Sequence, residues 1–526
     1  GFRVSLSRLK LLPLFLAGAL LNPARAQQTL TWDANTGSSG AQDGAGTWDT
    51  AANNWWNGSA NVLFVDGDNV SFGAANANAA HTVTLGASLS AGNVNFGGGN
   101  ALPRYTVDLG GNTLTVGGQL NLYAQANDYY SAFSNGTLSL ARVGSSQGSP
   151  DIFFDPNDGA DYGAFLTATV DVGTGSRYIR GAPQRNDFDR YFGDLRFDGP
   201  LTGSADLYFS GTTVDSSHNM HFGLNANNSG FTGAVTLNDN TDLALLDAAA
   251  LSSSNNLTFN TTSGRATLFL YGHNVTVGNL SDTSSGGSRF IRNGSLDVAN
   301  GGTNSSDHGQ QADSIITITQ TTSGSFSGVV ANGPNDNAAG AGGTYRTLGL
   351  TKAGAATLTL NGVNTYTGPT TVNAGTLQIG GGGQLNSGSY AGAVSLTGAL
   401  NYASTASQTL SGNITGGGSL THSGSATLTL SGSSNAYTGG TTWSGGNLTI
   451  GNGTALGTGP LDITKTSAGT LTVANNSATT VANNISLPAP GSATIYSLIK
   501  NSAGAALGTE LNLTGNLTGG NANTTL

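Results

Sequence analysis

Charged and aromatic residues that could support chemistry gather in one segment of this sequence, residues 151–200. The segment holds nine aspartates and five arginines, although the whole chain has only 28 acidic and 18 basic residues. Paired carboxylates can serve as the acid and base of glycoside hydrolysis, so a specialised site is first sought here. The competing interpretation is a charged loop with surface ion pairs. The charged residues are Asp151, Asp155, Asp158, Asp161, Asp171, Arg177, Arg180, Arg185, Asp187, Asp189, Arg190, Asp194, Arg196 and Asp198.

One short acidic stretch, Asp155-Pro156-Asn157-Asp158-Gly159-Ala160-Asp161, has the composition of a calcium-binding loop. Such loops combine clustered oxygen ligands with a glycine for the turn. The glycine falls one place early for an EF-hand, and the twelfth position is Leu166 instead of a bidentate glutamate. Flanking helices are also lacking. We therefore expect an acidic turn at this place and no metal site.

Asp187 and Asp189 are the carboxylates best spaced for catalysis, because side chains two positions apart on a strand share a face. Arg190 follows directly, so we interpret these residues as an ion-paired surface strand. His218 and His221 lie close together but lack a third metal ligand at a recognisable spacing. No nucleophile motif, phosphate loop or nucleotide fingerprint is present. The sequence predicts no catalytic, cofactor-binding or metal-binding residues.

Composition predicts the type of element that holds these residues. Only 9% of the residues are charged, and the chain contains one glutamate, four lysines and 81 glycines. Glutamate and lysine normally fill helix surfaces, whereas the abundant Thr, Ser, Asn and Gly suit strands and corners. Short alternating runs account for much of the 37% hydrophobic content, which argues against disorder. We expect an all-β protein with almost no helix.

Charge and cysteine content limit the partners and the compartment. The formal net charge is −10, and binding to nucleic acid requires a dense basic face, so we exclude nucleic acid as a partner. The chain has no cysteine. A disulfide formed before export would close a loop too wide to thread a secretion pore, so this absence suits an exported protein.

The first residues form an export signal. A basic start precedes the apolar run 11–21, and Ala24-Arg25-Ala26 supplies a small-x-small cleavage pattern. Eleven residues make about 16 Å of helix, too short for a hydrocarbon core of about 30 Å. We therefore predict that residues 1–26 are a secretory signal peptide, removed after Sec export, and that Gln27 begins the mature chain. The last residues are strand-like, and we expect the protein to continue beyond residue 526.

An internal repeat organises the second half of the chain. Residues 350–360 align with residues 420–430, and after one inserted residue the match continues to 379 and 450. A weaker copy of part of the repeat begins at Phe231. Short units that cannot bury an apolar face alone can do so when copies stack, so the repeat indicates a solenoid.

The residues within one copy predict how it folds. Polar and apolar residues alternate in Thr357-Leu358-Thr359-Leu360, which places both leucines on one face. Asn361-Gly362 is predicted to be a turn in which both residues tolerate positive φ. We predict an elongated parallel β-helix (a β-solenoid) with Leu358, Leu360, Leu428 and Leu430 inside and stacked asparagines in ladders at the corners. A series of β-sandwich domains is the alternative, but the turn signals come too often for its longer strands.

Residues 350–377 resemble the autotransporter-associated β-strand repeat, also called the passenger-associated transport repeat. Its pattern, Leu-Thr-Lys-x-Gly-x-x-Thr-Leu-Thr-Leu and then Asn-x-Tyr-Thr-Gly-x-Thr-Thr-Val-x-x-Gly-Thr-Leu, is matched nearly throughout. Residues 420–450 match with His422, Trp443 and Asn447 in place of the Lys, a Val and a Thr. The resemblance implies a β-helical passenger whose repeats assist secretion across the outer membrane, and a C-terminal translocation barrel as its partner.

These observations predict four parts. Residues 1–26 are the signal peptide, and residues 27–150 a β-solenoid or cap region rich in Trp, Asn and Gly. Residues 151–222 are a divergent charged and aromatic β region. Residues 223–526 are a β-solenoid with the repeats, best preserved at 350–379 and 420–450, and truncated at the C-terminus.

The predicted function is that of a secreted or cell-surface passenger with a structural or adhesive role, attached to the bacterial outer membrane, rather than an enzyme. Host-surface molecules or extracellular polysaccharides are the predicted ligands, and no cofactor is expected. An exported polysaccharide lyase or glycosidase on the same β-helix is the alternative.

Overall fold

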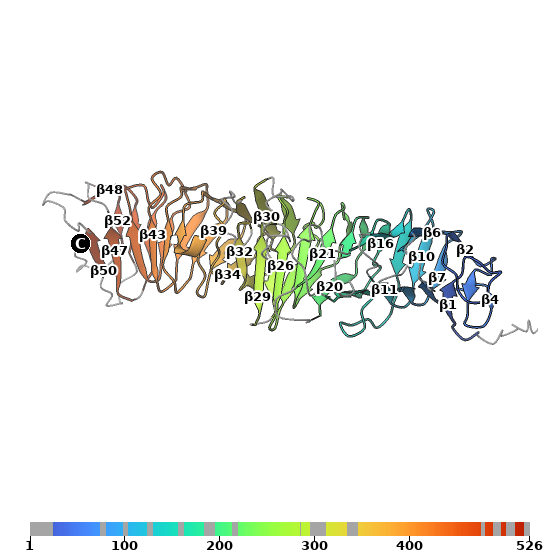
Figure 1. The fold of residues 1–526 in the computed structure, drawn as a ribbon. Coiled ribbons are helices and arrows are strands. Elements are labelled where there is room, and N and C mark those ends of the chain that lie inside the picture. The colour runs from blue at the N-terminus through green and yellow to red at the C-terminus, as the bar shows by residue number, and fades with distance from the viewer. Residues whose placement is uncertain are drawn as a thin grey trace, which may run out of the picture.

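The structure is a computed structural model. It is a long three-sided prism in which the chain winds in stacked coils of β-strands, and one complete coil is called a turn (Figure 1). Successive strands along the chain pass from one side to the next, and outside the antiparallel hairpin at the N-terminal end the strands pair in parallel with strands one turn away. The sides are called face 1, face 2 and face 3. The structure describes residues 25–73, 80–97, 104–123, 130–155, 163–182, 195–212, 219–283, 286–294, 312–333, 346–465, 467–474, 479–487, 496–500 and 511–519.

Face 1 consists of two sheets that follow one another along the prism. The first contains β1 (Thr29–Trp32), β3 (Trp55–Trp56), β4 (Asn61–Val62), β5 (Asn69–Phe72), β8 (Val94–Phe96), β11 (Leu120–Tyr123), β14 (Ile152–Asp155), β17 (Ser176–Gly181), β20 (Asp206–Gly211), β23 (Val235–Asn238), β25 (Leu257–Asn260) and β28 (Leu280–Asp282). The second contains β31 (Gly324–Phe326), β34 (Thr357–Leu360), β36 (Thr376–Ile379), β39 (Ala399–Tyr402), β42 (Ser419–His422), β44 (Thr441–Trp443), β46 (Leu461–Ile463), β49 (Ile485–Ser486) and β52 (Leu517–Thr518).

Face 2 also has two sheets. The first contains β2 (Gly46–Trp48), β6 (Ala80–Leu85), β9 (Arg104–Asp108), β12 (Tyr130–Ser134), β15 (Ala164–Leu166), β18 (Leu195–Phe197), β21 (Met220–Leu224), β24 (Thr241–Leu245), β26 (Arg265–Phe269), β29 (Ser288–Arg292) and β32 (Val329–Ala331). The second contains β37 (Ser389–Tyr390), β40 (Gln408–Leu410), β43 (Thr427–Leu430), β45 (Asn447–Ile450), β47 (Gly469–Val473) and β50 (Tyr496–Lys500).

Face 3 has three shorter sheets. The first contains β7 (Leu89–Ala91), β10 (Thr113–Val116), β13 (Thr137–Leu140), β16 (Thr169–Asp171), β19 (Leu201–Gly203) and β22 (Gly230–Phe231). The second contains β27 (Val275–Val277), β30 (Ser314–Thr319), β33 (Leu348–Ala353), β35 (Thr370–Val372), β38 (Val394–Leu396) and β41 (Ile414–Thr415). The third contains β48 (Thr479–Val481) and β51 (Leu511–Leu513).

The turns of the prism differ in length along the chain. Before the repeats, Leu138 of β13 pairs with Val170 of β16, which makes a long turn. In the repeat half, Leu358 pairs with Leu377 and Leu377 with Leu400, so these turns are shorter. The extra length lies in the connections, because the strands themselves are short in both halves. The stacked strands therefore keep a constant core while the corners vary.

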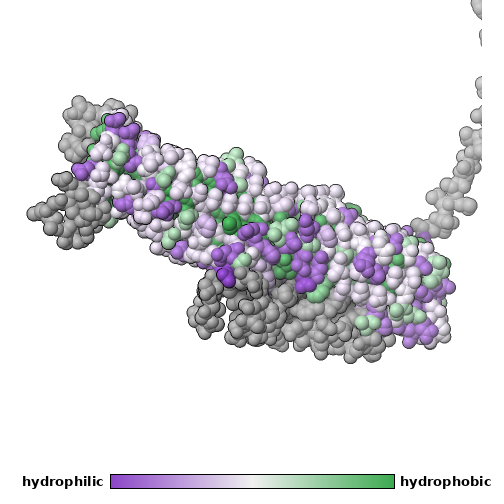
Figure 2. Space-filling view, turned by 90° about the horizontal axis from the view of Figure 1, so that it is seen from above, coloured by the Kyte–Doolittle hydropathy of each residue, from purple (hydrophilic) through white to green (hydrophobic). Residues whose placement is uncertain are grey.

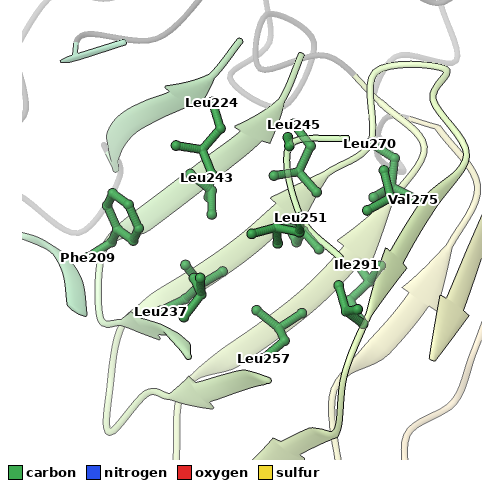
Figure 3. Packing of buried hydrophobic residues seen from close by; sticks show 14 of the residues in the cluster. Phe209, Leu224, Leu237, Leu243, Leu245, Leu251, Leu257, Leu270, Val275 and Ile291 are labelled. Carbon is green, nitrogen blue, oxygen red and sulfur yellow. The ribbon is translucent and has the colours of Figure 1, made fainter. Parts of the chain in front are cut away.

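The core is one column that runs inside the prism, and it follows from the alternation of the strands. In β34 the pattern of exposure alternates, and Leu358 and Leu360 are fully buried. Leu428 and Leu430 are also buried, so the predicted inside positions are confirmed. In the middle of the prism, side chains from the different faces fill the column (Figure 3). The residues labelled there are Phe209, Leu224, Leu237, Leu243, Leu245, Leu251, Leu257, Leu270, Val275 and Ile291.

The N-terminal end of the column is closed by aromatic side chains. Trp32, Trp48, Trp55 and Phe64 are buried, and the Trp55 ring centroid lies 5.2 Å from those of both Trp32 and Trp48. The antiparallel strands β3 and β4 extend the face 1 sheet over this end. The predicted parallel β-helix is confirmed. In the described residues the only helical element is the short 3₁₀ turn η1 (Asn386–Gly388), and no helix among them is long and apolar enough to span a membrane.

Two expectations about the corners had different outcomes. Asparagine ladders are present at a corner, since the Asn279 amide donates to Asn256 at 3.0 Å just before β28 and β25, and at strand ends, since the Asn260 amide donates to Asn238 at 2.9 Å. Asn361 and Gly362 lie at a corner after β34, as predicted, but neither adopts the positive φ that both residues tolerate. Gly362 is required for another reason: a Cβ there would lie 1.9 Å from the carbonyl oxygen of Gly328 in the previous turn.

Candidate functional site

Several residues that the sequence singled out lie outside the described part of the chain. Asp158 and Asp161 of the acidic loop are among them, and so are Asp187, Asp189 and His218. Asp155, at the start of the loop, ends strand β14. The described residues contain no group of three His, Asp or Glu side chains that could hold a metal ion.

Three of the described charged residues of the segment 151–200 bond to the backbone of neighbouring turns. Arg177 donates to the Arg142 carbonyl at 3.1 Å, and Arg180 to the Gln147 carbonyl at 2.9 Å. Asp151 accepts from the Tyr178 amide at 2.8 Å. The predicted surface ion pairing is therefore wrong for these arginines. Corners leave carbonyls that no strand partner uses, and a guanidinium with five donors can cap them.

One ion pair in this segment fits the prediction. The Arg196 guanidinium contacts both carboxylate oxygens of Asp198, at 2.5 and 2.8 Å. The same guanidinium lies over the Phe165 ring, 4.0 Å from its centroid. Arg196 is thus held by a cation–π contact on one side and a bidentate carboxylate on the other, which is a packing arrangement on the outside of face 2.

A charged cluster around the fully buried Asp242 lies on the outer side of face 2. Asp242 of β24 is fully buried and accepts from the Asn219 amide at 2.8 Å and the Arg265 guanidinium at 2.9 Å. His221 of β21 lies 3.5 Å from the same carboxylate through Nε2. Burial alone raises the pKa of Asp242, but Arg265, then His221 and Asn219, outweigh it and hold the pKa below its ordinary value.

This cluster ties together three successive turns. His221 and Asp242 are directly paired across β21 and β24, and Arg265 begins the next strand, β26. A carboxylate that is ionised, buried and occupied by these donors lacks the free lone pair and raised pKa of a general base. We assign it a structural role. Sequence reasoning singled out His221 but missed Asp242 and Arg265, whose proximity depends on the length of each turn.

The repeat at residues 350–379 and 420–450 is the second candidate site, and its buried asparagine is its first distinctive feature. Asn364 accepts from the Val330 amide at 3.0 Å in the previous turn and donates to the Gln384 carbonyl at 3.1 Å in the next. Asn435 in the second copy makes the same pair of bonds, to Ile414 at 2.8 Å and Ala455 at 2.7 Å. Each asparagine side-chain amide thus takes the place of a backbone peptide group in the hydrogen-bond ladder between turns.

Each copy also has one side without a strand. After β34 the chain crosses face 2 as residues 361–369, and after β43 it crosses face 3 as residues 431–440. A buried tyrosine fills each gap: the Tyr366 hydroxyl lies 2.8 Å from the Thr370 hydroxyl, and Tyr437 lies 2.5 Å from Thr441. The Asn-x-Tyr-Thr-Gly pattern therefore builds a compact side that replaces a strand.

The position of the motif lysine is a buried cation site. Lys352 is fully buried, and its Nζ donates to the carbonyls of Gly354 at 2.8 Å, Ala353 at 2.9 Å and Ala374 at 3.0 Å. In the second copy His422 occupies the equivalent place, with Nε2 3.0 Å from the Asn447 carbonyl and Nδ1 3.3 Å from the Tyr402 carbonyl. Backbone carbonyls surround both side chains.

The two copies occupy different sides of the prism. In the first copy β33 and β35 belong to face 3 and β34 and β36 to face 1. In the second copy β42 and β44 belong to face 1 and β43 and β45 to face 2. The distance in sequence between the copies thus corresponds to three full turns and one further side. Equivalent outward side chains of the two copies do not line up in one stripe.

Comparison with protein families agrees with this description of the repeat. The passenger-associated-transport-repeat family model matches residues 350–379 and 420–450. The chain therefore carries two such repeats, which indicate a secreted or cell-surface autotransporter passenger. Comparison with curated proteins and with solved structures gave no match.

Proposed function

We propose that this chain, which carries two passenger-associated transport repeats, is the structural or adhesive passenger of an autotransporter-like bacterial protein and is not an enzyme. One observation carries the proposal: the two stretches that match the family model are stacked units of the β-helix. Each has a buried asparagine, a buried tyrosine and a carbonyl-lined site that holds Lys352 in the first copy and His422 in the second. A translocation barrel would be its partner in export.

The architecture supports secretion of an unfolded chain followed by folding outside. Each turn contacts only its neighbours, so turns can add one after another as they emerge. The sequence has few charged groups and no cysteine. The export signal in residues 1–26 supplies the route to the periplasm by the Sec pathway.

The surface supports a structural or adhesive role. Between residues 346 and 465 the only charged side chains are Arg346, Lys352, Asp462 and Lys465, and the outward positions are mostly Thr, Ser, Asn and Gly. Much of the described surface in Figure 2 is accordingly of intermediate hydropathy. A long surface rich in hydroxyl and amide groups suits host-surface or polysaccharide ligands, because each such group can donate and accept hydrogen bonds.

Surface display in a Gram-negative host tests this proposal. The gene would be expressed with Leu358→Asp, which places a charge in the core, or with Thr359→Asp, which places the same charge outside on the same strand. We expect Leu358→Asp to lower protease-accessible protein on intact cells severalfold, whereas Thr359→Asp leaves it unchanged. Equal display of the two variants, or wild-type chain that stays inside the cell, would contradict the proposal.

Incubation with polysaccharides tests the non-enzymatic part. Purified protein would be mixed with a panel of acidic and neutral polysaccharides, with and without calcium, and reducing ends and unsaturated products would be measured. We expect no turnover. Turnover lost in Asp187→Ala or Asp189→Ala would identify an enzyme instead, because a general acid or base contributes about 10²–10⁴-fold in rate.

A further inference from the structure

The strand at the N-terminal tip of the prism has a free edge. β4 is the last strand of the twelve-stranded sheet on face 1 and pairs with β3 alone. It lies at the far end of the molecule from the repeats (Figure 1). A free edge presents a row of backbone donors and acceptors that another strand can use.

The chain keeps the alternation of a strand from Val62 to Val65, beyond the paired residues. Phe64 is buried and Val62 packs against the core, whereas Leu63 and Val65 are 42% and 44% exposed. The described residues contain only six exposed large hydrophobic side chains, and two of them stand here, two positions apart. Outward positions on the strands of the repeats are mostly Thr, Ser or Asn, and Val363 is the one large hydrophobic residue exposed among the two matched stretches.

The backbone of this segment is also open. Among the hydrogen bonds of the described residues, none involves the backbone of Leu63 or Phe64. The edge ends at Val65, whose amide donates to the Asp68 carboxylate at 3.2 Å and whose carbonyl accepts from the Asp68 amide at 3.0 Å. Inside the prism, by contrast, Asn435 caps the edge of β41. In an antiparallel pair the backbone groups of successive residues point to opposite sides, and Val62 faces Trp55 of β3. The donors and acceptors at the free edge are therefore those of the alternate residues Asn61 and Leu63.

The charge of the tip selects the kind of strand that fits. Residues 25–73 contain five aspartates and a single basic residue, Arg25. Arg25 is already engaged, since its guanidinium lies 3.3 Å from Asp68. Asp66 and Asp68 directly follow the open segment. A partner with basic side chains gains from this field, and one with acidic side chains is repelled.

We propose that the β4 edge binds an extended, basic peptide segment of another protein by β-strand addition. The segment pairs with the backbone of Asn61 and Leu63, and its alternate apolar side chains cover Leu63 and Val65. Main-chain hydrogen bonds supply affinity in this mode, and the side chains supply selectivity. The inference rests on the proposed function and names a partner class for the adhesive part of the passenger.

Binding of synthetic strands to purified residues 27–526 tests this inference. Three ten-residue peptides would be compared: alternating valine and lysine, alternating valine and glutamate, and the valine–lysine peptide with alternate backbone amides N-methylated. We expect the first to bind at least tenfold more tightly than the other two. Hydrogen exchange should slow at the Leu63 amide when it binds.

Variants of the edge locate the site. Leu63→Pro removes an amide that no described residue accepts, and Leu63→Lys adds a charge to the edge; both should weaken binding at least tenfold. Val143→Lys, at a side chain 94% exposed elsewhere, is the matched control and should bind as the wild type does. If Leu63→Pro fails to fold, peptide binding by Leu63→Lys alone tests whether the edge is the binding site.

Three results would overturn the inference. They are equal binding of the N-methylated peptide, unchanged binding by Leu63→Lys, and no binding of any peptide at millimolar concentration. A dimer that forms with rising protein concentration and is abolished by Leu63→Lys would assign the edge to a second copy and reject it as well. None of these results depends on secretion, so failure here is distinct from failure of surface display.

Discussion

Lys352 places an ammonium group inside the β-helix with backbone carbonyls as its partners. Burial lowers the pKa of Lys352 to about 8. Lys352→Met keeps the apolar stem but leaves three carbonyls without this donor, and each unsatisfied buried group costs about 1–3 kcal/mol. We expect a clear loss of thermal stability at pH 7, measured by denaturation.

The direction in which stability changes with pH follows from the lowered pKa of Lys352. The folded pKa of about 8 lies below the ordinary lysine value of about 10.4, so between these values the unfolded chain holds the extra proton. Stability should therefore rise with pH across that window in the wild type. Lys352→Met should lack this rise, and identical slopes in the two proteins would contradict the assignment.

His422 gives the second copy a pH dependence of the same sign in a lower pH window. Burial lowers the pKa of His422, the carbonyls at its ring nitrogens oppose this, and Lys465 adds to the lowering. Stability due to neutral His422 is present above the ordinary value of about 6.5 and is lost as the pH falls through the folded pKa. We expect denaturation midpoints to drop between pH 7 and pH 5 less steeply in His422→Gln than in the wild type.

At the scale of the element, the side without a strand depends on one amide. Asn435→Asp keeps the acceptor for the Ile414 amide but turns a negative charge toward the Ala455 carbonyl, which lies 2.7 Å from the native nitrogen. We expect a loss of about 3–5 kcal/mol at pH 7, as for other uncompensated buried charges. Protonation restores a donor, so part of the loss should be recovered near pH 4.

An exposed asparagine supplies the control for this experiment. Asn413 accepts from the Ser434 amide at 3.0 Å through its side-chain oxygen, and a carboxylate can accept there equally well. Asn413→Asp should be nearly neutral in chemical denaturation. If it were as destabilising as Asn435→Asp, the role assigned to the buried amide would be wrong.

Elements of the fold differ in how far the sequence predicts them. The alternation of Thr357 to Leu360 predicts an inward face, and the structure confirms it, because period 2 depends only on local geometry. Pairing between turns is not local. Asp242 and Arg265 meet because the turn between them has one particular length, and since turn length varies along the chain, residue numbers alone cannot bring them together.

The sequence also does not predict which of two neighbouring asparagines in the repeat is buried. Asn361 beside Gly362 has the stronger turn signal, yet Asn364 is the one that enters the core. What decides is the position of Val330 one turn below and Gln384 one turn above, which the motif does not reveal. The charged segment shows the same limit, since arginines that suggested ion pairs cap carbonyls of adjacent turns.

At the scale of the whole molecule, processing and fold can be checked together. Secreted protein should begin at Gln27 in N-terminal sequencing, because the cleavage pattern ends at Ala26. Circular dichroism of that material should show a β spectrum with negligible helix, in keeping with the short η1 as the only helix among the described residues. Retention of the apolar run 11–21, or helix above about one fifth of the residues against a typical third, would contradict these predictions.

The ladder bonds between strands run along the long axis of the prism, and this direction has a mechanical consequence. A force that pulls the two ends apart loads the bonds of the outermost turn first, while the turns behind it remain shielded. The molecule should then unfold one turn at a time, starting from its ends. Each released turn of about 20 residues adds about 70 Å of contour length at about 3.3–3.6 Å per residue. Pulling single molecules should therefore give a regular sawtooth in the repeat half and longer steps around the turn from Leu138 to Val170.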